Sequence, residues 1–193
     1  MPDGMVWNTW IKPGKFHVDE ISNDELWSRW QYFMENIIAE AEENDVILAA
    51  HPDDPPMQRL RSNARLVNTP EGFYRLVDSV PSPCNKLELC IGTLQEMEGD
   101  FDLYANIASL CKRDAVGYVH LRNVKGKVPE YTETLIDDGD IDIPRAIRML
   151  AENGFSGPIV PDHTPYLDCK EPWLSGMAFQ IGYIRACIDS LSL

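Results

Sequence analysis

Residues 102–122, DLYANIASLCKRDAVGYVHLR, decide the fold, because they place a helix and a short strand directly after one another. The segment 102–113 has the pattern of a helix, and the apolar run 115–122 has the length of a buried strand. This strand carries His120 and Arg122 at its carboxyl end. Such a unit predicts an α/β protein if it recurs along the chain.

The same order of helix and strand occurs four times, and a final helix follows. The predicted pairs are 22–43 with 45–50, 69–80 with 86–92, 102–113 with 115–122, and 142–154 with 158–162, before the helix 175–191. Alternating helices and short apolar strands predict a parallel sheet covered by helices. The long polar loops after the strands are typical of an α/β barrel or a doubly wound sheet.

Length and composition are those of one globular domain, 1–193, without a dividing linker. The net charge is −14 and no basic cluster occurs, which disfavours binding to nucleic acid or to an anionic membrane. No run reaches the ~18 apolar residues of a membrane span, and the amino terminus has no apolar signal segment. The five cysteines are odd in number and lack CxxC spacing, which predicts reduced thiols in a cytoplasmic protein.

Each predicted strand has, at its carboxyl end, a residue whose side chain can bind a metal ion. These residues are His51, Cys90, His120 and Asp162, and consecutive members lie 30 to 42 residues apart. That spacing is about one repeat of strand, loop and helix, so the four side chains converge at one end of a barrel. Nitrogen, sulfur and oxygen donors together suit a divalent transition ion. Ligands from four separate strands favour a catalytic ion over a structural zinc.

Each of these residues also has a simpler interpretation when it is taken alone. A histidine at a strand end can be structural, Cys90 can be a core residue, and Asp162 can be a turn residue. A nucleophilic Cys90 is a further alternative, ranked below ligation because no histidine is its obvious partner in the sequence. The combination decides for a metal site, since three of the four histidines of the chain fall at strand ends or just past one.

Several neighbours of these residues could take part in chemistry. His163 follows the last ligand and could act as an acid or base beside the ion. Arg122 lies two residues after His120 on the same strand face, and either holds a substrate carboxylate or makes a surface salt bridge. Asp53 and Asp54 either orient a ligand histidine or are turn acids.

The segments around these residues resemble the mannonate dehydratase family. They are HPDDPP (51–56), TPEGFYRLVDSVPSP (69–83), LELCIGTLQEM (87–97), YVHLRNVKG (118–126), ETLIDDGDID (133–142), GFSGPIVPDHTP (154–165) and GMAFQIGYIRA (176–186). The resemblance extends from about residue 20 to near the end of the chain. Motifs of this length and order are far more specific than a short pattern.

The resemblance implies a TIM barrel of the xylose-isomerase-like type, and a reaction that converts D-mannonate to 2-keto-3-deoxy-D-gluconate and water with Mn²⁺ or Fe²⁺. It implies that His51, Cys90, His120 and Asp162 are the metal ligands, the same four that the spacing indicates. It also implies that His163 is catalytic, and that Arg122, with Asn123 beside it, binds the sugar-acid substrate.

Two departures from the family pattern matter. A full barrel needs ~250 residues, and this sequence matches only the C-terminal half, with four strands. It is therefore either a fragment of a longer product or a truncated relative, and its open sheet edge and apolar face predict a homo-oligomer. Some members also have a catalytic Tyr after the Asp–His pair. Tyr166 and Trp173 lie in that segment without a clear register, so the second acid or base stays open.

Two other functions and one unassigned segment complete the expectations. One alternative is a metal-dependent sugar isomerase or epimerase on the same barrel type. The other is a truncated half-barrel that binds metal without catalysis. Residues 1–18 are expected to form an N-terminal extension or loop, whose Trp7, Trp10 and Phe16 suggest packing onto a neighbour.

Overall fold

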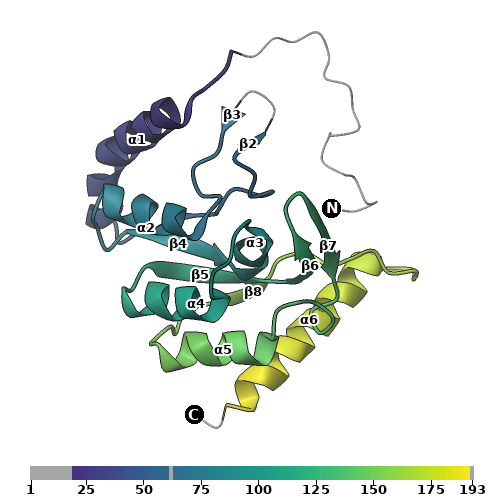
Figure 1. The fold of residues 1–193 in the computed structure, drawn as a ribbon. Helices are drawn as coiled ribbons and strands as arrows, with labels where there is room; N and C mark the ends of the chain where they lie inside the picture. The colour runs from purple at the N-terminus through teal and green to yellow at the C-terminus, as the bar shows by residue number, and fades with distance from the viewer. Residues whose placement is uncertain (1–18, 61–62, 192–193) are drawn as a thin grey trace.

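A four-stranded parallel sheet with the order β1-β4-β5-β8 forms the centre of the protein. A computed structural model describes residues 19–60 and 63–191 (Figure 1). The sheet strands are β1 (Leu48–Ala50), β4 (Asn85–Cys90), β5 (Val116–Leu121) and β8 (Ile159–Pro161). The predicted parallel sheet of four strands is thus confirmed, with its strands side by side in chain order. The segment 1–18, with Trp7, Trp10 and Phe16, lies outside the described residues.

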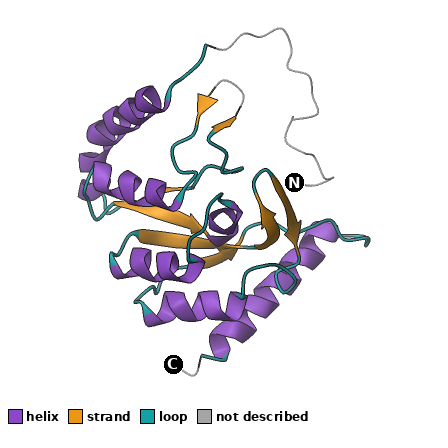
Figure 2. Cartoon of the chain, in the orientation of Figure 1, coloured by secondary structure: helices purple, strands orange, loops and turns teal. Residues whose placement is uncertain are grey.

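Helices cover the sheet, and the five predicted ones are all present (Figure 2). The helices are α1 (Asn23–Glu43), α2 (Pro70–Ser79), α3 (Ile91–Glu96), α4 (Leu103–Lys112), α5 (Ile143–Glu152) and α6 (Pro172–Asp189). The expected helix-start signals are present. The Ser22 side chain caps α1 by accepting a hydrogen bond from the Glu25 amide at 3.2 Å, and Pro70 lies in the first turn of α2. None of the helices among the described residues is long and apolar enough to cross a bilayer.

The two faces of the sheet differ, because side chains alternate along each strand. One face is apolar and packs against helices, and the other carries polar side chains. Leu87 and Leu89 on β4 and Val119 on β5 are fully buried in the core that α2, α4 and α5 cover. Because side chains alternate along a strand, Glu88 and His120 project from the opposite face. The sequence pattern of apolar strands therefore carries the polar residues to the side that the helices leave uncovered.

Three features were absent from the sequence-based expectation. Helix α3 starts directly after β4, where the expected strand ran on to residue 92, and the Cys90 sulfur accepts from the Thr93 amide at its first turn. The segments expected as loops contain two antiparallel hairpins. These are β2 (Arg59–Leu60) with β3 (Asn63–Ala64), and β6 (Asn123–Lys127) with β7 (Glu130–Thr134). Both hairpins carry few apolar residues, so they lack the sustained apolar alternation by which a strand is recognised.

The sheet has two open edges in the part of the chain that the structure describes. There, β1 pairs with β4 alone and β8 pairs with β5 alone. Exposed apolar side chains lie at both edges, with Val46 and Ile47 each 49 % exposed and Val160 39 % exposed. This is the arrangement expected of half a barrel.

Candidate metal centre

The sheet register brings the predicted metal ligands to one end of the strands. Cys90 stands opposite His120, and His120 stands opposite Val160, two residues before Asp162. His51 directly follows Ala50, the last residue of β1. The carboxyl ends of these four strands meet at one edge of the sheet, which is where α/β barrels place their active sites.

The donor atoms of these side chains lie close together and form a cluster. His120 Nδ1 lies 3.5 Å from Asp162 Oδ1, and Cys90 Sγ lies 3.8 Å from Asp162 Oδ2. The rings of His51 and His120 have centroids 5.7 Å apart. Ligand atoms of His51, Cys90 and Asp162 all lie within 4.8 Å of one another. His51, Cys90 and Asp162 thus offer one compact set of possible metal ligands, and His120 borders this set at Asp162.

Glu88 is a fifth member of the cluster, and the sequence-based reasoning missed it. Its Oε1 lies 2.8 Å from His120 Nδ1 and 4.0 Å from His51 Nε2. With the two histidines it forms a second set whose ligand atoms lie within 4.8 Å of one another. The signal in the sequence was the period of two: in LELC, Glu88 and Cys90 share a strand face. A carboxylate between the two leucines of this strand was the available clue.

The tautomer of His51 suits metal binding. Its Nδ1 lies 2.6 Å from the carbonyl oxygen of Pro52, which only accepts hydrogen bonds. Nδ1 therefore carries the proton, and the Nε2 lone pair is left for an ion. Of the two interpretations of Asp53, the structure favours the structural one over orientation of this ring, because its Oδ2 accepts hydrogen bonds from the Leu66 and Val67 amides at 2.6 and 2.8 Å.

Cys90 is a buried thiol beside charged groups. Burial raises the pKa of Cys90 to about 12, while Arg122 opposes the rise and Asp162 adds to it. The Thr93 hydroxyl donates to the sulfur at 3.1 Å. Without an ion the thiol holds its proton at neutral pH, so ligation by Cys90 requires proton release on metal binding.

Arg122 contacts the cluster through Asp162, and its side chain is almost fully buried at 2 % exposure. Its Nε donates to Asp162 Oδ2 at 2.9 Å, and its Nη2 donates to Asp54 Oδ2 at 2.7 Å. Its Nη1 donates to Glu96, which has no exposed side-chain surface. The surface-salt-bridge interpretation is therefore wrong. The partners on each side of the guanidinium are carboxylates of the protein itself, and Asp54 is one of them rather than a partner of His51.

Burial raises the pKa of Glu96 to about 7, and the Arg122 cation acts against this rise. Gly92 is required at its position, because a Cβ there would lie 2.5 Å from Arg122 Cγ. The sequence thus leaves room for the guanidinium at the start of α3.

Asn123 does not face the cluster. It is 1 % exposed, and its Nδ2 donates to the carbonyls of Ile136 and Ile141 at 2.8 and 2.9 Å. Its Oδ1 accepts from the amides of Val124 and Ile141, each at 3.0 Å. With both donors and both lone pairs in use, the side chain braces the loop after β7 and has no group left for a substrate.

His163 lies next to the cluster and is 30 % exposed. Its Nε2 is 3.4 Å from Asp162 Oδ2, and its Nδ1 makes an ion-pair contact with Glu133 Oε1. Tyr166 and Trp173, the candidates for a further acid, are 69 % and 48 % exposed. Tyr131 of β7 instead reaches inward, and its hydroxyl donates to Asp54 Oδ1 at 3.3 Å.

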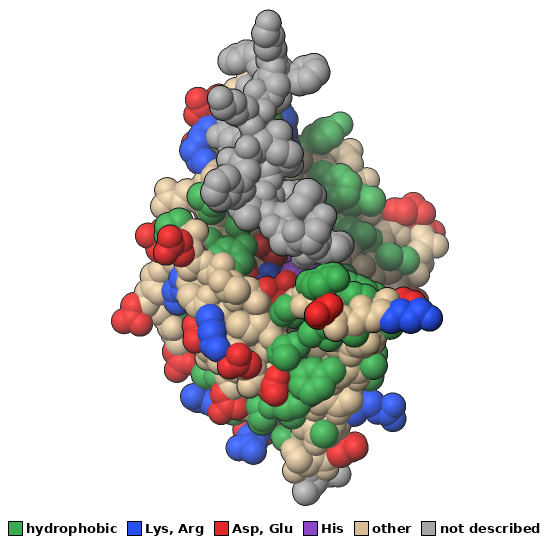
Figure 3. Space-filling model, turned by 90° about the vertical axis from the view of Figure 1, so that its right-hand side faces the viewer, with side chains coloured by type: hydrophobic (Ala, Val, Ile, Leu, Met, Phe, Trp, Pro, Cys, Tyr) green, Lys and Arg blue, Asp and Glu red, His purple; other side chains and the backbone are tan. Residues whose placement is uncertain are grey.

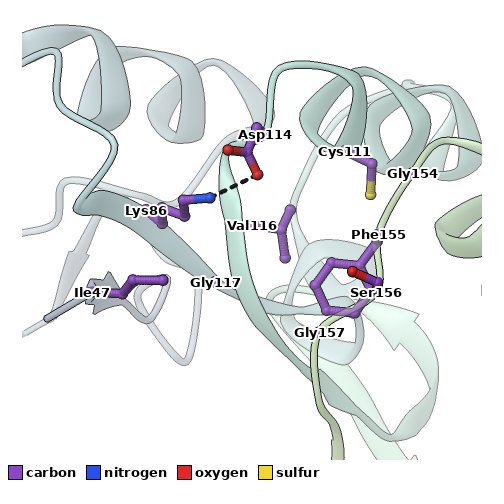
Figure 4. A pocket seen from close by; sticks show the side chains of 10 residues that line it. All are labelled: Ile47, Lys86, Cys111, Asp114, Val116, Gly117, Gly154, Phe155, Ser156 and Gly157. Atoms are coloured by element: carbon purple, nitrogen blue, oxygen red, sulfur yellow. Dashed lines mark hydrogen bonds and ion pairs between the residues drawn. The ribbon is translucent and has the colours of Figure 1, made fainter. Parts of the chain in front are cut away.

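A separate cavity of about 190 Å³ lies at the opposite end of the strands (Figure 4). Its lining includes Lys86 and Val116, at the amino ends of β4 and β5. Lys86 Nζ pairs there with Asp114 Oδ1 at 2.7 Å. The pairing uses the only cation of the lining, so this cavity offers no comparable set of reactive groups.

The cluster's donors fit a divalent transition ion. Two imidazoles, one thiol and two carboxylates combine the N, S and O donors that such ions accept. Mg²⁺ and Ca²⁺ favour oxygen ligands alone, so the imidazoles and the thiol point away from these two ions and toward a transition ion.

Comparison with known proteins points to one enzyme family. The family model described as D-mannonate dehydratase (UxuA) matches residues 14–192. The mannonate dehydratase of Streptococcus equi subsp. zooepidemicus is 32% identical over 145 residues, which are 74% of this chain and 39% of that protein. Mannonate dehydratase 1 of Bacillus licheniformis is 32% identical over 179 residues, which are 89% of this chain and 48% of that protein. The chain spans less than half the length of these curated relatives.

Solved structures place the fold among TIM barrels. The crystal structure of mannonate dehydratase from Streptococcus suis serotype 2 matches with a TM-score of 0.75 and 26% identity, over 89% of this chain and 52% of that one. A xylose isomerase-like TIM barrel protein from Mycobacterium smegmatis, solved in complex with magnesium, matches with a TM-score of 0.61 and 18% identity, over 94% of this chain and 55% of that one. The four strands and their helices are thus a part of such a barrel.

Proposed function

The chain belongs to the D-mannonate dehydratase family, and from this premise we propose that its strand-end cluster serves the metal-dependent dehydration of D-mannonate to 2-keto-3-deoxy-D-gluconate and water. The observation that carries the proposal is the convergence of imidazole, thiol and carboxylate donors within 4.8 Å at the carboxyl ends of neighbouring strands. The chain spans about half of its relatives, so the activity of the whole protein is part of the proposal.

We assign the metal to His51, Cys90, His120 and Asp162, with Mn²⁺ or Fe²⁺ as the ion. Glu88 Oε1 lies 2.8 Å from His120 Nδ1, so this carboxylate is placed to orient the ring of a ligand histidine. A bound divalent ion polarises the oxygens of a hydroxy acid and stabilises the negative charge that forms beside its carboxylate.

The protein's own groups would move the protons. Dehydration removes the proton beside the substrate carboxylate and requires a proton for the departing hydroxide. His163 is the group that we assign to one of these transfers, because it borders the cluster through Asp162 and is still 30 % exposed. We assign Arg122 to holding Asp162 in place, in preference to direct contact with substrate.

The experiment uses purified protein loaded with Mn²⁺ and incubated with D-mannonate. We expect a keto-deoxy acid, detected by thiobarbiturate after periodate oxidation, and loss of that signal after chelation of the metal. An isomerised sugar without this signal would instead support the isomerase or epimerase alternative. Metal binding without any turnover would support a non-catalytic half-barrel.

We also propose that the 193-residue chain associates with itself through its open sheet edges. The apolar side chains Ile47 and Val160 lie exposed at these edges, and hydrophobic side chains gather over α6 on the face shown in Figure 3. We expect light scattering to give a mass above the 21.9 kDa of one chain. A lysine at the β1 edge, Ile47→Lys, should shift the mass toward the monomer.

The matched control for this variant is Tyr32→Lys, which places the same charge at a residue of helix α1 that is 71 % exposed. It should leave the mass unchanged. A mass of one chain at all protein concentrations would contradict edge association.

A further inference from the structure

The β6–β7 hairpin brings a carboxylate to His163 that the proposed function does not use. Glu133 stands on β7 opposite Val124 of β6, and its side chain is 18 % exposed. Its Oε1 lies in contact with His163 Nδ1. The imidazole thus lies between two carboxylates, Glu133 at Nδ1 and Asp162 at Nε2, the latter 3.4 Å away.

The hairpin is held firmly enough to place this carboxylate. The Val128 amide donates to the Glu96 carbonyl at 2.9 Å, and the Asp140 amide donates to the Val124 carbonyl at 2.8 Å. Asn123 adds the four hydrogen bonds described above at the base of the hairpin. Glu133 is therefore delivered by a braced element, as precise positioning requires.

His163 is fixed from the other side as well. Gln180 of α6 is 1 % exposed and donates from Nε2 to the His163 carbonyl at 2.8 Å. The backbone of His163 is thereby tied to α6 and its ring nitrogen to β7. Two elements that are far apart in the sequence set the orientation of one imidazole.

We propose that Glu133 is the positioning residue of His163. Both carboxylates only accept hydrogen bonds, but Glu133 lies nearer to Nδ1 than Asp162, 3.4 Å away, lies to Nε2, so Glu133 retains the proton of the neutral ring on Nδ1. The Nε2 lone pair is then directed to the metal cluster, where a proton can be taken up. A carboxylate that fixes the tautomer of a catalytic imidazole is a general device in proton transfer. This inference deepens the proposed function, on which the role of His163 rests.

The first test measures the tautomer and does not depend on turnover. Side-chain ¹⁵N spectra of the metal-free protein are recorded at rising pH until the histidine signals no longer shift, so that the neutral ring is observed. The chain has four histidines, and His163→Gln identifies the signal of His163. We expect the Nδ1–H form in the wild type, and a shift to a mixture richer in Nε2–H in Glu133→Met.

Two further variants separate positioning from a merely structural effect. Glu133→Gln keeps an acceptor oxygen and should restore the Nδ1–H form. Glu130→Met removes a carboxylate from an exposed position of the same strand and should behave as the wild type. If Glu133→Met does not fold by circular dichroism, Glu133→Ala takes its place. An unchanged His163 tautomer in a folded variant without the carboxylate overturns the proposal.

The second test distinguishes this proposal from the proposed function. In a protein that dehydrates D-mannonate, Glu133→Met should lower kcat by roughly 100-fold with little change in KM, since Glu133 acts through His163 and not on the substrate. A tautomer shift in a protein without activity would overturn the proposed function and support the positioning. An unchanged His163 tautomer in a Glu133→Met protein, with wild-type protein that dehydrates D-mannonate, would overturn the positioning role and support the proposed function.

Discussion

Asp162→Asn should cost the protein its divalent metal. Asp162 is the carboxylate that connects the cluster, since its oxygens lie 3.5 Å from His120 Nδ1 and 3.8 Å from Cys90 Sγ. Asparagine keeps the shape but removes the negative charge that balances the ion. Loss of a residue that merely supports a ligand costs about 10- to 100-fold in affinity, so loss of a charged ligand should cost at least about 100-fold. Competition with a chelator of known Mn²⁺ affinity measures the change.

Asp168→Asn provides the matched control. Asp168 is an exposed residue of the loop that follows the Asp–His pair, and its replacement makes the same change of charge. We expect its Mn²⁺ affinity to equal that of the wild type. Equal affinity in Asp162→Asn as well would show that this carboxylate is not a ligand.

Arg122→Met should cause the largest loss of stability among the substitutions considered. It removes the cation between Glu96, Asp54 and Asp162 but leaves the carboxylates in place, with Glu96 fully buried. Removing one partner of a buried ion pair costs about 3–5 kcal/mol, because the remaining charge is uncompensated. Urea unfolding of the metal-free protein measures the free energy difference.

The loss should also depend on pH, and the sign follows from Glu96. Its pKa of about 7 in the folded protein lies above the ordinary glutamate value of 4.5, so the folded state binds a proton more readily than the unfolded state. Without Arg122 this pKa rises further. The stability that protonated Glu96 contributes is therefore present at low pH and lost as the pH rises. Arg122→Met should thus lower the free energy of unfolding more at pH 8 than at pH 5.

Arg29→Met is the control for this variant. Arg29 pairs with Glu25 on the surface of α1, where the side chains are 56% and 50% exposed. Exposed pairs of this kind contribute about 0.3–0.5 kcal/mol. A similar loss in the two arginine variants would mean that the buried charge network does not stabilise the fold.

The order of helices and strands could be predicted because each element carries a local signal. Proline in the first turn of α2, the cap at Ser22 and the apolar runs of β4 and β5 are all visible in the sequence. The gathering of His51, Cys90, His120 and Asp162 followed from one rule, that parallel strands end at a common edge.

The partners of these residues could not be predicted, because their contacts are distant in the chain. Arg122 bonds to Glu96, 26 residues away, and to Asp54, 68 residues away. Glu133 reaches His163 from a hairpin whose polar strands looked like a loop. Asn123 looked like a substrate residue because it follows Arg122, yet its backbone leaves the sheet there and its amide turns to the loop.

Binding of Co²⁺ to the intact chain tests the central claim most directly. Co²⁺ takes the place of other divalent ions, and a thiolate ligand gives it an intense near-ultraviolet charge-transfer band. We predict that this band saturates at one ion per chain, is displaced by Mn²⁺ and is absent in Cys90→Ser. No saturable binding, or a saturating spectrum without the thiolate band, would contradict a metal centre built from the strand ends.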